Sequence, residues 1–460
     1  MKQKLTFTYG TETRDVEIDP DLLATPLIAP RPSDGAPRPP REVLVEALAA
    51  PLGRPPLRQM VAGKKVAMII SDEFRAGLHE TILDVMVEEM AAGGPAEVAV
   101  LCGTGTHDPA IYTPKIRQWT EAASARHGLP VTFVAHDCDD PKLVEVGTTQ
   151  RGSPVILEPS WLEADVRVSA HEAKHHYMAG YSSVLKHVLP SISGRASVVN
   201  NHRLALDDDS QAGQHPLHPD PARRSNPFSE DALEAFRMSL AYTVGPDGTV
   251  VDKPAESFLI DMISDKDEVF FTRAGDPELV TPQICAAADR QAEFTVPASR
   301  YVLLSPGGPP ASTALYGVQN CFDMALLGAI EQNGEALVFG PCNGRPGMEP
   351  DARGLAPDGK SKALFWDNLV RFKDTPLEEA YREIHDNFKL YLWKTWRVLR
   401  LFKRDGIRIW IYGELSPQIL AEGGFEHCAD PQAWIDERVT RGDGKFVAID
   451  GGNKLLVRPA

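Results

Sequence analysis

Residues that can bind a metal or move a proton gather in one segment of the chain. They are His171, His175, His176, Lys186, His187 and His202. A neutral imidazole is a good ligand for mid-row transition metals, and histidine is also the side chain that titrates near pH 7. Taken singly, His175 or His187 is equally well explained as a solvated helix residue. Their clustering predicts a metal site or a proton-transfer site.

Two further polar clusters follow apolar runs earlier in the chain. The sequence GTGTH occupies Gly103–His107, and SDEFR carries Asp72 and Arg75. The backbone amides of a Gly-rich loop can hold a phosphate, although Gly and Thr also form ordinary turns. A guanidinium fork suits a carboxylate or a phosphate, and an exposed charged turn is the simpler alternative. Both clusters are therefore candidate anion sites.

Alternating apolar strands and helices place these clusters at one edge of a sheet. Continuous apolar runs, typical of strands buried on both faces, alternate with helical patterns over 79–94 and 113–128. The runs cover 64–71, 96–102, 131–136 and 164–171. Parallel strands all end at the same edge, where such sheets bind ligands. Three polar clusters begin where a predicted strand ends, so we expect a site at that edge.

A second α/β pattern begins near residue 301. It comprises strands over 301–308, 335–340 and 408–413, a helix over 318–334, a helical stretch over 361–403 and a terminal strand from 446. A chain of 460 residues is too long for one ordinary core. We therefore expect an α/β fold with two α/β domains and largely parallel sheets, one spanning 1–285 and the other 286–460.

The charge and cysteine content exclude several classes of partner. The 64 acidic residues outnumber the 48 basic ones, giving a net charge of −16, which disfavours binding to nucleic acid or anionic membranes. No run of 18 apolar residues occurs, so no membrane span is expected. The six cysteines lack CxxC spacing, which favours free thiols in a reducing cytoplasm over disulfides or a zinc knuckle.

The order of the motifs along nearly the whole chain resembles that of the lactate racemase family. The specific part is HxxxGxSxxxK at 176–186 followed by Asn201–His202. Shorter pieces, each unspecific alone, are Tyr9–Gly10, SDxxR at 71–75, GTGTH at 103–107, Asn226–Pro227, Ala274–Asp276 and GGPP…LY at 307–316. The resemblance implies a nickel-pincer nucleotide as cofactor and an active site in the cleft between the two domains.

The resemblance also implies a role for each matching residue. Lys186 would hold the cofactor covalently through a thioamide bond, and His202 would be the protein ligand of the nickel. His107 and His176 would be acid/base residues on opposite sides of the substrate carbon. Asp72 would support the cofactor site, and Arg75 would bind the substrate carboxylate. The loop residues expected near the cofactor phosphate are Gly103, Thr104, Gly105 and Thr106.

The implied activity is that of an isomerase, a racemase or epimerase acting at C2 of a 2-hydroxy acid. The α-hydrogen of such an acid is a poor acid, because the carbanion would lie beside a carboxylate. Removing hydride while a histidine takes the hydroxyl proton avoids that carbanion, and one base on each face serves both stereoisomers. The implied partners are the substrate and cofactor-biosynthesis proteins, in a cytoplasmic enzyme that is a candidate homo-oligomer.

The chain departs from the lactate pattern beside Tyr316. Gly317 and Asn320 stand where the lactate enzymes have a Gln and a Lys that help to hold the substrate. Loss of the cation weakens the hold on a small carboxylate, and loss of the Gln opens space. We therefore expect a substrate larger than lactate, such as a sugar acid or an aryl or branched hydroxy acid. Further candidates to line the site are Trp366, Arg345 and Arg353.

Two other functions remain open from the sequence alone. The histidine cluster would also suit a metal-dependent hydrolase, although the chain has no HExxH motif. A non-catalytic binding homologue would keep the fold and lose a residue of the site. None of His107, His176, Lys186 and His202 is lost.

Overall fold

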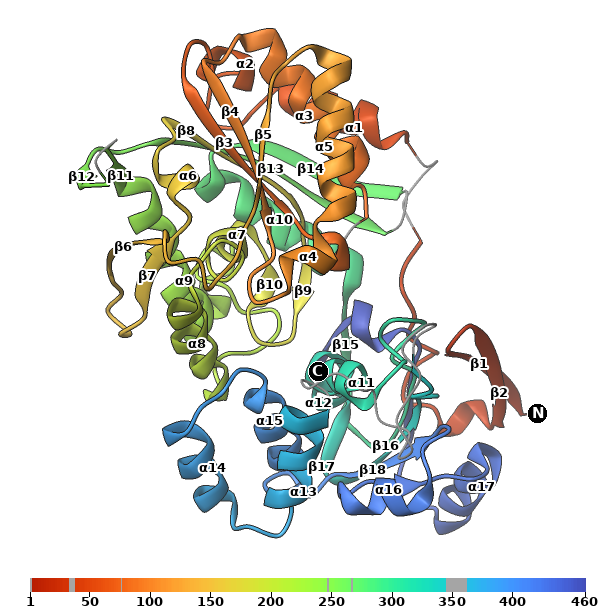
Figure 1. Cartoon of the computed structure of the whole chain (residues 1–460). Helices are drawn as coiled ribbons and strands as arrows, with labels where there is room; N and C mark the ends of the chain where they lie inside the picture. The colour runs from red at the N-terminus through yellow and green to blue at the C-terminus, as the bar shows by residue number, and fades with distance from the viewer. Residues whose placement is uncertain (1, 33–37, 76, 246–247, 266–267, 345–361) are drawn as a thin grey trace. The chain divides into compact units, whose positions relative to one another are not determined.

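The computed structural model describes residues 2–32, 38–75, 77–245, 248–265, 268–344 and 362–460. These residues form two compact units. The N-terminal unit contains Ser33–Lys174 and Ala179–Gln291. The C-terminal unit contains Met1–Pro32, His175–Met178 and Ala292–Ala460. Each unit is organised around its own sheet (Figure 1).

The N-terminal unit is built on a six-stranded sheet with the order β14-β13-β8-β3-β4-β5. Every neighbouring pair is parallel except β13 and β14. In chain order the strands are β3 (Lys65–Ser71), β4 (Glu97–Gly103), β5 (Thr132–Ala135), β8 (Val166–Glu172), β13 (Glu256–Asp265) and β14 (Glu268–Gly275). The expected strands are present, and the parallel arrangement is confirmed.

Helices cover both faces of this sheet, as continuous apolar strands require. A core of side chains that are under 6% exposed joins one face to α1 (Pro40–Ala49), α2 (Leu57–Met60), α3 (His79–Gly93) and α5 (Pro114–His127). On the other face, α6 (Pro159–Leu162) and α7 (Val184–Val188) pack against β3, and α7 also contacts β8. Helices α3 and α5 end at Gly94 and Gly128, whose φ angles of 65° and 64° form left-handed caps.

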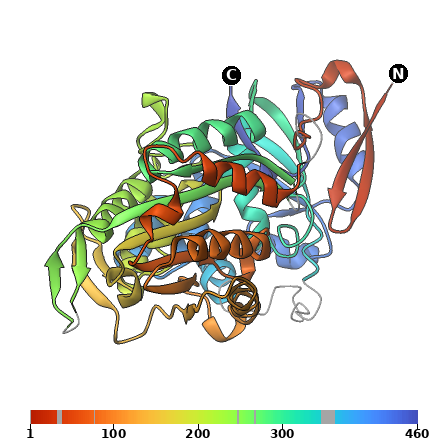
Figure 2. The same cartoon turned by 90° about the horizontal axis from the view of Figure 1, so that it is seen from above.

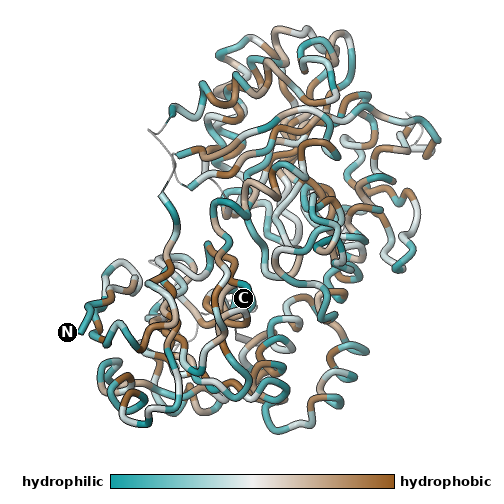
Figure 3. Tube along the Cα trace, turned by 180° about the vertical axis from the view of Figure 1, so that it is seen from behind, coloured by the Kyte–Doolittle hydropathy of each residue, from teal (hydrophilic) through white to brown (hydrophobic). Residues whose placement is uncertain are grey.

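The C-terminal unit has a five-stranded parallel sheet with the order β19-β18-β17-β16-β20. Its strands are β16 (Ser299–Leu304), β17 (Ile330–Phe339), β18 (Arg408–Tyr412), β19 (Glu426–His427) and β20 (Phe446–Ile449). A separate parallel pair joins β15 (Glu293–Val296) to β21 (Leu456–Pro459). In Figure 3 the apolar residues concentrate along the strands of both units.

The N-terminal hairpin packs with the C-terminal unit, which differs from the expected domain spanning 1–285. It consists of β1 (Gln3–Tyr9) and β2 (Glu12–Ile18), which alternate apolar and polar residues. The apolar side joins the C-terminal core, where Phe7 stacks on Phe339 with 4.4 Å between ring centroids. Figure 2 shows the hairpin beside α17 (Pro431–Arg441). The hairpin's apolar face is therefore buried by residues at the far end of the chain.

Two expected helices are interrupted. The helix expected over 318–334 is α11 (Leu315–Cys321), a π-turn (Phe322–Leu326) and α12 (Leu327–Ala329), after which the chain enters β17. The stretch expected over 361–403 contains α13 (Asp367–Phe372), α14 (Leu377–Asp386) and α15 (Leu392–Lys403). Pro376 precedes α14, and Tyr391 with φ of 80° precedes α15, so the helical path is broken at both residues.

The remaining elements lie in the connections. The helices are α4 (Pro109–Tyr112), α8 (Arg195–Arg203), α9 (Pro227–Ala241), α10 (Pro277–Ala292) and α16 (Pro417–Glu422). The strands are β6 (Val144–Thr148), β7 (Pro154–Leu157), β9 (Lys174–His176), β10 (Gly180–Ser182), β11 (Tyr242–Val244) and β12 (Val250–Asp252).

Across the described part of the chain, no helix has the length and apolar character needed to cross a membrane. All six cysteines are buried free thiols.

Replacing Phe7 by Ala tests the place of the hairpin in the C-terminal core. Phe7 is fully buried against Phe339, so the variant Phe7→Ala should lose about 3 to 5 kcal/mol of unfolding free energy. Denaturant titration followed by circular dichroism measures this loss. The control Leu279→Ala removes a side chain that is 52% exposed and should change stability little. Equal stability of the two variants would contradict the packing of the hairpin.

Candidate active site

The register of the N-terminal sheet brings the expected polar clusters to one edge. Ser71 at the end of β3 pairs with Gly103 at the end of β4. Ile69 pairs with Ser169, so His171 on β8 lies level with Ser71. The turns that begin at Asp72 and Thr104 therefore start side by side, as the sequence predicted.

His107 is oriented by Asp72. The Nδ1 atom of His107 lies 2.6 Å from the Oδ2 atom of Asp72, whose side chain is 2% exposed. A carboxylate only accepts, so Nδ1 carries the proton and Nε2 remains the basic nitrogen of the neutral ring. The rings of Phe74 and Tyr112 flank the imidazole at 5.3 and 5.0 Å between centroids. The side chain of Arg75 lies outside the described residues.

The GTG loop packs against the turn that follows α7. The amide of Gly105, which has φ of 57°, donates to the carbonyl of Ser191 at 2.9 Å. The hydroxyl of Thr104 donates to the carbonyl of His136 at 2.6 Å. A Cβ at Gly103 would lie 2.7 Å from the Cβ of Ser191, so the close approach requires glycine. These two donors bind the chain itself, and they give no support to the phosphate contact expected of Thr104 and Gly105.

Lys186 and His202 contact the same aromatic ring. The Nζ atom of Lys186, on α7, lies 5.4 Å from the ring centroid of Phe228 at the start of α9. His202, on α8, packs edge-on against that ring at 5.1 Å between centroids. Both side chains are nearly buried, with residue exposures of 5% and 6%. The structure thus gathers the two residues on which the motif spacing depends.

The tautomer of His202 is fixed by its own helix. Its Nδ1 atom lies 2.9 Å from the carbonyl oxygen of Val198, one turn earlier. A carbonyl can only accept, so Nδ1 carries the proton and the lone pair of the neutral ring is on Nε2. Metal-binding histidines commonly hold a backbone carbonyl with the nitrogen that does not bind the metal.

Two more histidines of the cluster form a buried network under the same edge. His171 contacts Asp261 through Nδ1 at 3.1 Å and Ser182 through Nε2 at 3.2 Å. His187 contacts Ser71 through Nε2 at 3.2 Å and packs edge-on against His171. Burial raises the pKa of Asp261 well above its ordinary value. His187 is 1% exposed, so the alternative of a solvated helix residue does not apply to it.

A buried ionic cluster supports the segment that leads to α7. Asp289 accepts from the hydroxyl of Tyr181 at 2.5 Å, pairs with Arg223 at 2.8 Å and contacts Nε2 of His218 at 3.0 Å. Burial raises the pKa of Tyr181 and lowers that of the neighbouring His215 to about 3. Sequence reasoning missed this cluster, because Arg223 and Asp289 lie in segments without a recognisable motif.

The C-terminal unit holds the other expected site residues. The ring of His176 stacks on that of Tyr177 at 4.7 Å between centroids, and its Nδ1 accepts from the amide of Met178 at 3.4 Å. Tyr316, Gly317 and Asn320 lie on α11. A Cβ at Gly317 would lie only 2.8 Å from the carbonyl oxygen of Ala311. A side chain at this position would therefore meet backbone, which gives no support to the interpretation that Gly317 opens space.

The remaining candidates are Trp366, Arg345 and Arg353. Trp366 is fully buried and stacks on Phe425, so it belongs to the core. Arg345 and Arg353 lie outside the described residues.

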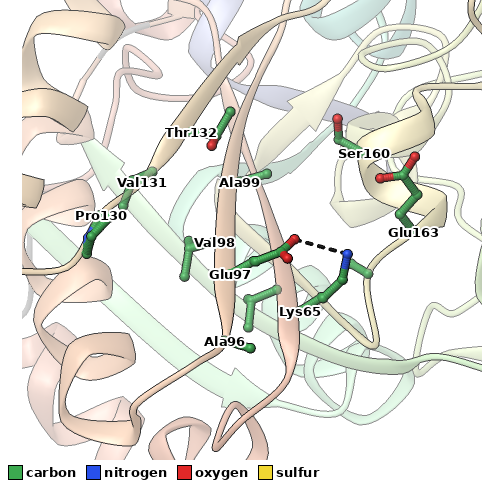
Figure 4. A pocket seen from close by; sticks show the side chains of 12 residues that line it. Lys65, Ala96, Glu97, Val98, Ala99, Pro130, Val131, Thr132, Ser160 and Glu163 are labelled. Atoms are coloured by element: carbon green, nitrogen blue, oxygen red, sulfur yellow. Dashed lines mark ion pairs between the residues drawn. The ribbon is translucent and has the colours of Figure 1, made fainter. Parts of the chain in front are cut away.

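Figure 4 shows a groove at the opposite edge of the N-terminal sheet. Its ion pair, Lys65–Glu97, is exposed, as expected of a solvated surface.

The comparisons with known proteins agree with this arrangement. Residues 9–213 match the lactate racemase N-terminal domain. The chain is 25% identical over 370 residues to the lactate racemase of Lactiplantibacillus plantarum, covering 80% of this chain and 78% of the relative. It is 23% identical over 345 residues to the lactate racemase of Thermoanaerobacterium thermosaccharolyticum, covering 74% and 75%.

Solved structures share the fold. The lactate racemase apoprotein of Thermoanaerobacterium thermosaccharolyticum superposes with a TM-score of 0.79 at 18% identity, covering 99% of this chain and all of that one. A Thermotoga maritima protein gives a TM-score of 0.59 at 16% identity, covering 93% and 100%. The fold is thus an α/β architecture found in a racemase apoprotein.

These similarities support the resemblance to the lactate racemase family that was drawn from the motifs: residues 9–213 match the family's N-terminal domain, and both relatives are lactate racemases. The relatives support a racemase, and hence an isomerase, activity.

Removing Arg223 tests the buried support of the site. The variant Arg223→Met leaves the carboxylate of Asp289 without its cation, so the unfolding free energy should fall by about 3 kcal/mol. The control Arg195→Met breaks the exposed pair with Asp139 and should cost below about 1 kcal/mol. Thermal unfolding of both variants measures the difference. A loss no larger in Arg223→Met than in its control would mean that the cluster does not support this segment.

Proposed function

We propose that this chain inverts the C2 centre of a 2-hydroxy acid larger than lactate, using a nickel-pincer nucleotide held at Lys186. The observation that carries the proposal is the meeting of Lys186 and His202 on the ring of Phe228. A lysine and a histidine that are distant in sequence, both nearly buried, converge on one aromatic surface. This is the pair that a covalent, metal-bearing cofactor requires.

The donor groups of the chain fit this cofactor. A primary amine at Lys186 can form the thioamide link, and Nε2 of His202 offers a lone pair to nickel. The fully buried ring of Phe228 contacts both side chains and so keeps them close to each other. The chemistry that the cofactor supplies when bound is an electrophilic carbon able to accept hydride.

His107 serves as the base in the proposed reaction. Its Nε2 atom is the unprotonated nitrogen, because Nδ1 donates to Asp72. When Nε2 takes the hydroxyl proton of the substrate, the ring becomes an imidazolium, and the carboxylate of Asp72 stabilises that charge. Asp72 therefore acts as a positioning residue for His107.

His176 serves as the acid in the same direction. Its Nδ1 atom accepts from the amide of Met178, so Nε2 carries the proton of the neutral ring. In the proposed inversion the hydroxyl proton leaves and a proton later returns to the same oxygen. His107 can take the first proton, and His176 can donate the second. The reverse reaction exchanges the two roles.

Intact mass tests the cofactor assignment. The protein is co-expressed with the cofactor-making enzymes that the proposal requires as partners. The wild-type chain should then gain mass at Lys186 and contain stoichiometric nickel, whereas Lys186→Ala should gain neither. The control Lys389→Ala removes an exposed lysine and should keep both. An adduct that persists in Lys186→Ala would show that the anchor lies elsewhere.

Racemisation assays test the two-base arrangement. Among 2-hydroxy acids screened by chiral chromatography, we expect larger ones to be turned over faster than lactate. On the best of them, Asp72→Asn and His107→Ala should keep the adduct and lose turnover on the order of a hundredfold. The first variant removes the carboxylate that orients His107, and the second removes the base itself. The control Asp139→Asn alters an exposed carboxylate and should remain active. Full activity of both site variants would refute the role of His107.

A further inference from the structure

Lys394 is a buried lysine on α15 that the sequence did not single out. Its residue exposure is 2%. The Nζ atom donates to the carbonyl oxygen of Tyr316 at 2.7 Å and to Oδ1 of Asn320 at 2.6 Å. The ammonium also lies 4.0 Å from the ring centroid of Tyr316. Its acceptors thus belong to α11, where the substrate-binding residues were expected.

Among the described residues, the ammonium of Lys394 forms no ion pair with a carboxylate. The nearby Asp323 accepts instead from Gln319 at 2.6 Å and pairs with Arg397 at 3.1 Å. The two neutral acceptors of Lys394 take two of its three N–H groups. A buried ammonium ordinarily requires a countercharge, because neutral acceptors do not repay its desolvation.

Lys394 lies one aromatic ring away from a proposed acid/base residue. Its Nζ atom is 5.0 Å from the ring centroid of Tyr177, and the imidazole of His176 stacks on that ring at 4.7 Å between centroids. The hydroxyl of Tyr177 accepts from the indole of Trp393 at 3.0 Å, which fixes the ring in place. Lys394 and His176 thus contact the same aromatic ring within the C-terminal unit.

We propose that Lys394 binds the carboxylate of the substrate and so selects 2-hydroxy acids over neutral analogues. This inference rests on the proposed function and names the group that recognises its substrate. Helix α11 carries no cation of its own between Leu315 and Cys321. Lys394 supplies one from α15, held at the backbone of Tyr316 and the side chain of Asn320.

The charge state of Lys394 makes this binding depend on pH. Burial lowers the pKa of Lys394 to about 7, with Asp323 and Cys321 opposing the shift and Arg397 adding to it. The phenol of Tyr316 and that of Tyr177 face the ammonium as neutral groups. The ammonium is therefore present below this pKa and lost as the pH rises through it. Carboxylate binding should weaken over the same interval.

The test compares mandelate with mandelamide, which has the same size but no carboxylate charge. Binding to the wild-type holoprotein is measured by calorimetry at about pH 6 and about pH 8. Because the protonated fraction of a group with this pKa falls about tenfold over that interval, the preference for mandelate should fall by about the same factor. This arm needs no variant. An equal preference at both pH values, or no preference, would overturn the inference.

Variants of Lys394 give the second arm. Lys394→Gln keeps a donor without charge and should lose the preference for mandelate by about tenfold to a hundredfold, whereas Lys394→Arg should retain it. The matched control Lys389→Gln changes an exposed lysine and should behave as wild type. Thermal unfolding checks that each variant is folded. A preference that survives in folded Lys394→Gln would overturn the inference.

The two proposals fail in different ways. If wild-type protein racemises a 2-hydroxy acid but Lys394→Gln still prefers mandelate, only the assignment of Lys394 is wrong. If protein that carries the Lys186 adduct racemises no 2-hydroxy acid, the proposed function is wrong, and the inference falls with it.

Discussion

Parallel pairing of β3 with β4 and β8 is the constraint on which the candidate site depends. Each pair fixes the level at which its strands end, so that Ser71, Gly103 and His171 reach the same edge. The turns after them must then lie side by side, and the polar residues of those turns must meet. A slip of a single residue between β3 and β4 would turn Asp72 away from His107, and the contact of His171 with Asp261 depends in the same way on the pairing of β8 with β13.

Buried polar groups around this edge are held by specific partners. The carboxylates of Asp72, Asp261 and Asp289 each contact a histidine, and Asp289 also has a guanidinium. These contacts limit the arrangements open to the side chains, although Oδ1 of Asp72 and Oδ2 of Asp261 have no hydrogen-bond partner among the described residues. The contact with Asp72 also sets which nitrogen of His107 carries the proton, and the carbonyl of Val198 does the same for His202. The buried contact between Asp72 and His107 therefore both holds the two side chains in place and sets the protonation of the base proposed for the site.

The sequence predicted those parts of the molecule that have a local signal. Continuous apolar runs gave the strands of the N-terminal sheet, and the spacing of Lys186 and His202 gave the pair that meets at Phe228. Contacts between distant segments had no such signal. The pairing of Arg223 with Asp289 and the approach of Lys394 to Asn320 depend on packing, which periodicity does not encode. The helix expected over 318–334 ended early because its last residues pair in β17.

The packing of Phe7 against Phe339 has a consequence for synthesis on the ribosome. The β1–β2 hairpin leaves the exit tunnel before the N-terminal unit, whereas β17 follows only after the whole of that unit has been made. An isolated hairpin is marginally stable in water, so the apolar face of this hairpin stays exposed until the C-terminal unit forms. The N-terminal unit can fold in that interval, because its core is contained in its own segments. The nascent chain thus completes its C-terminal unit around a hairpin that was made before the N-terminal unit.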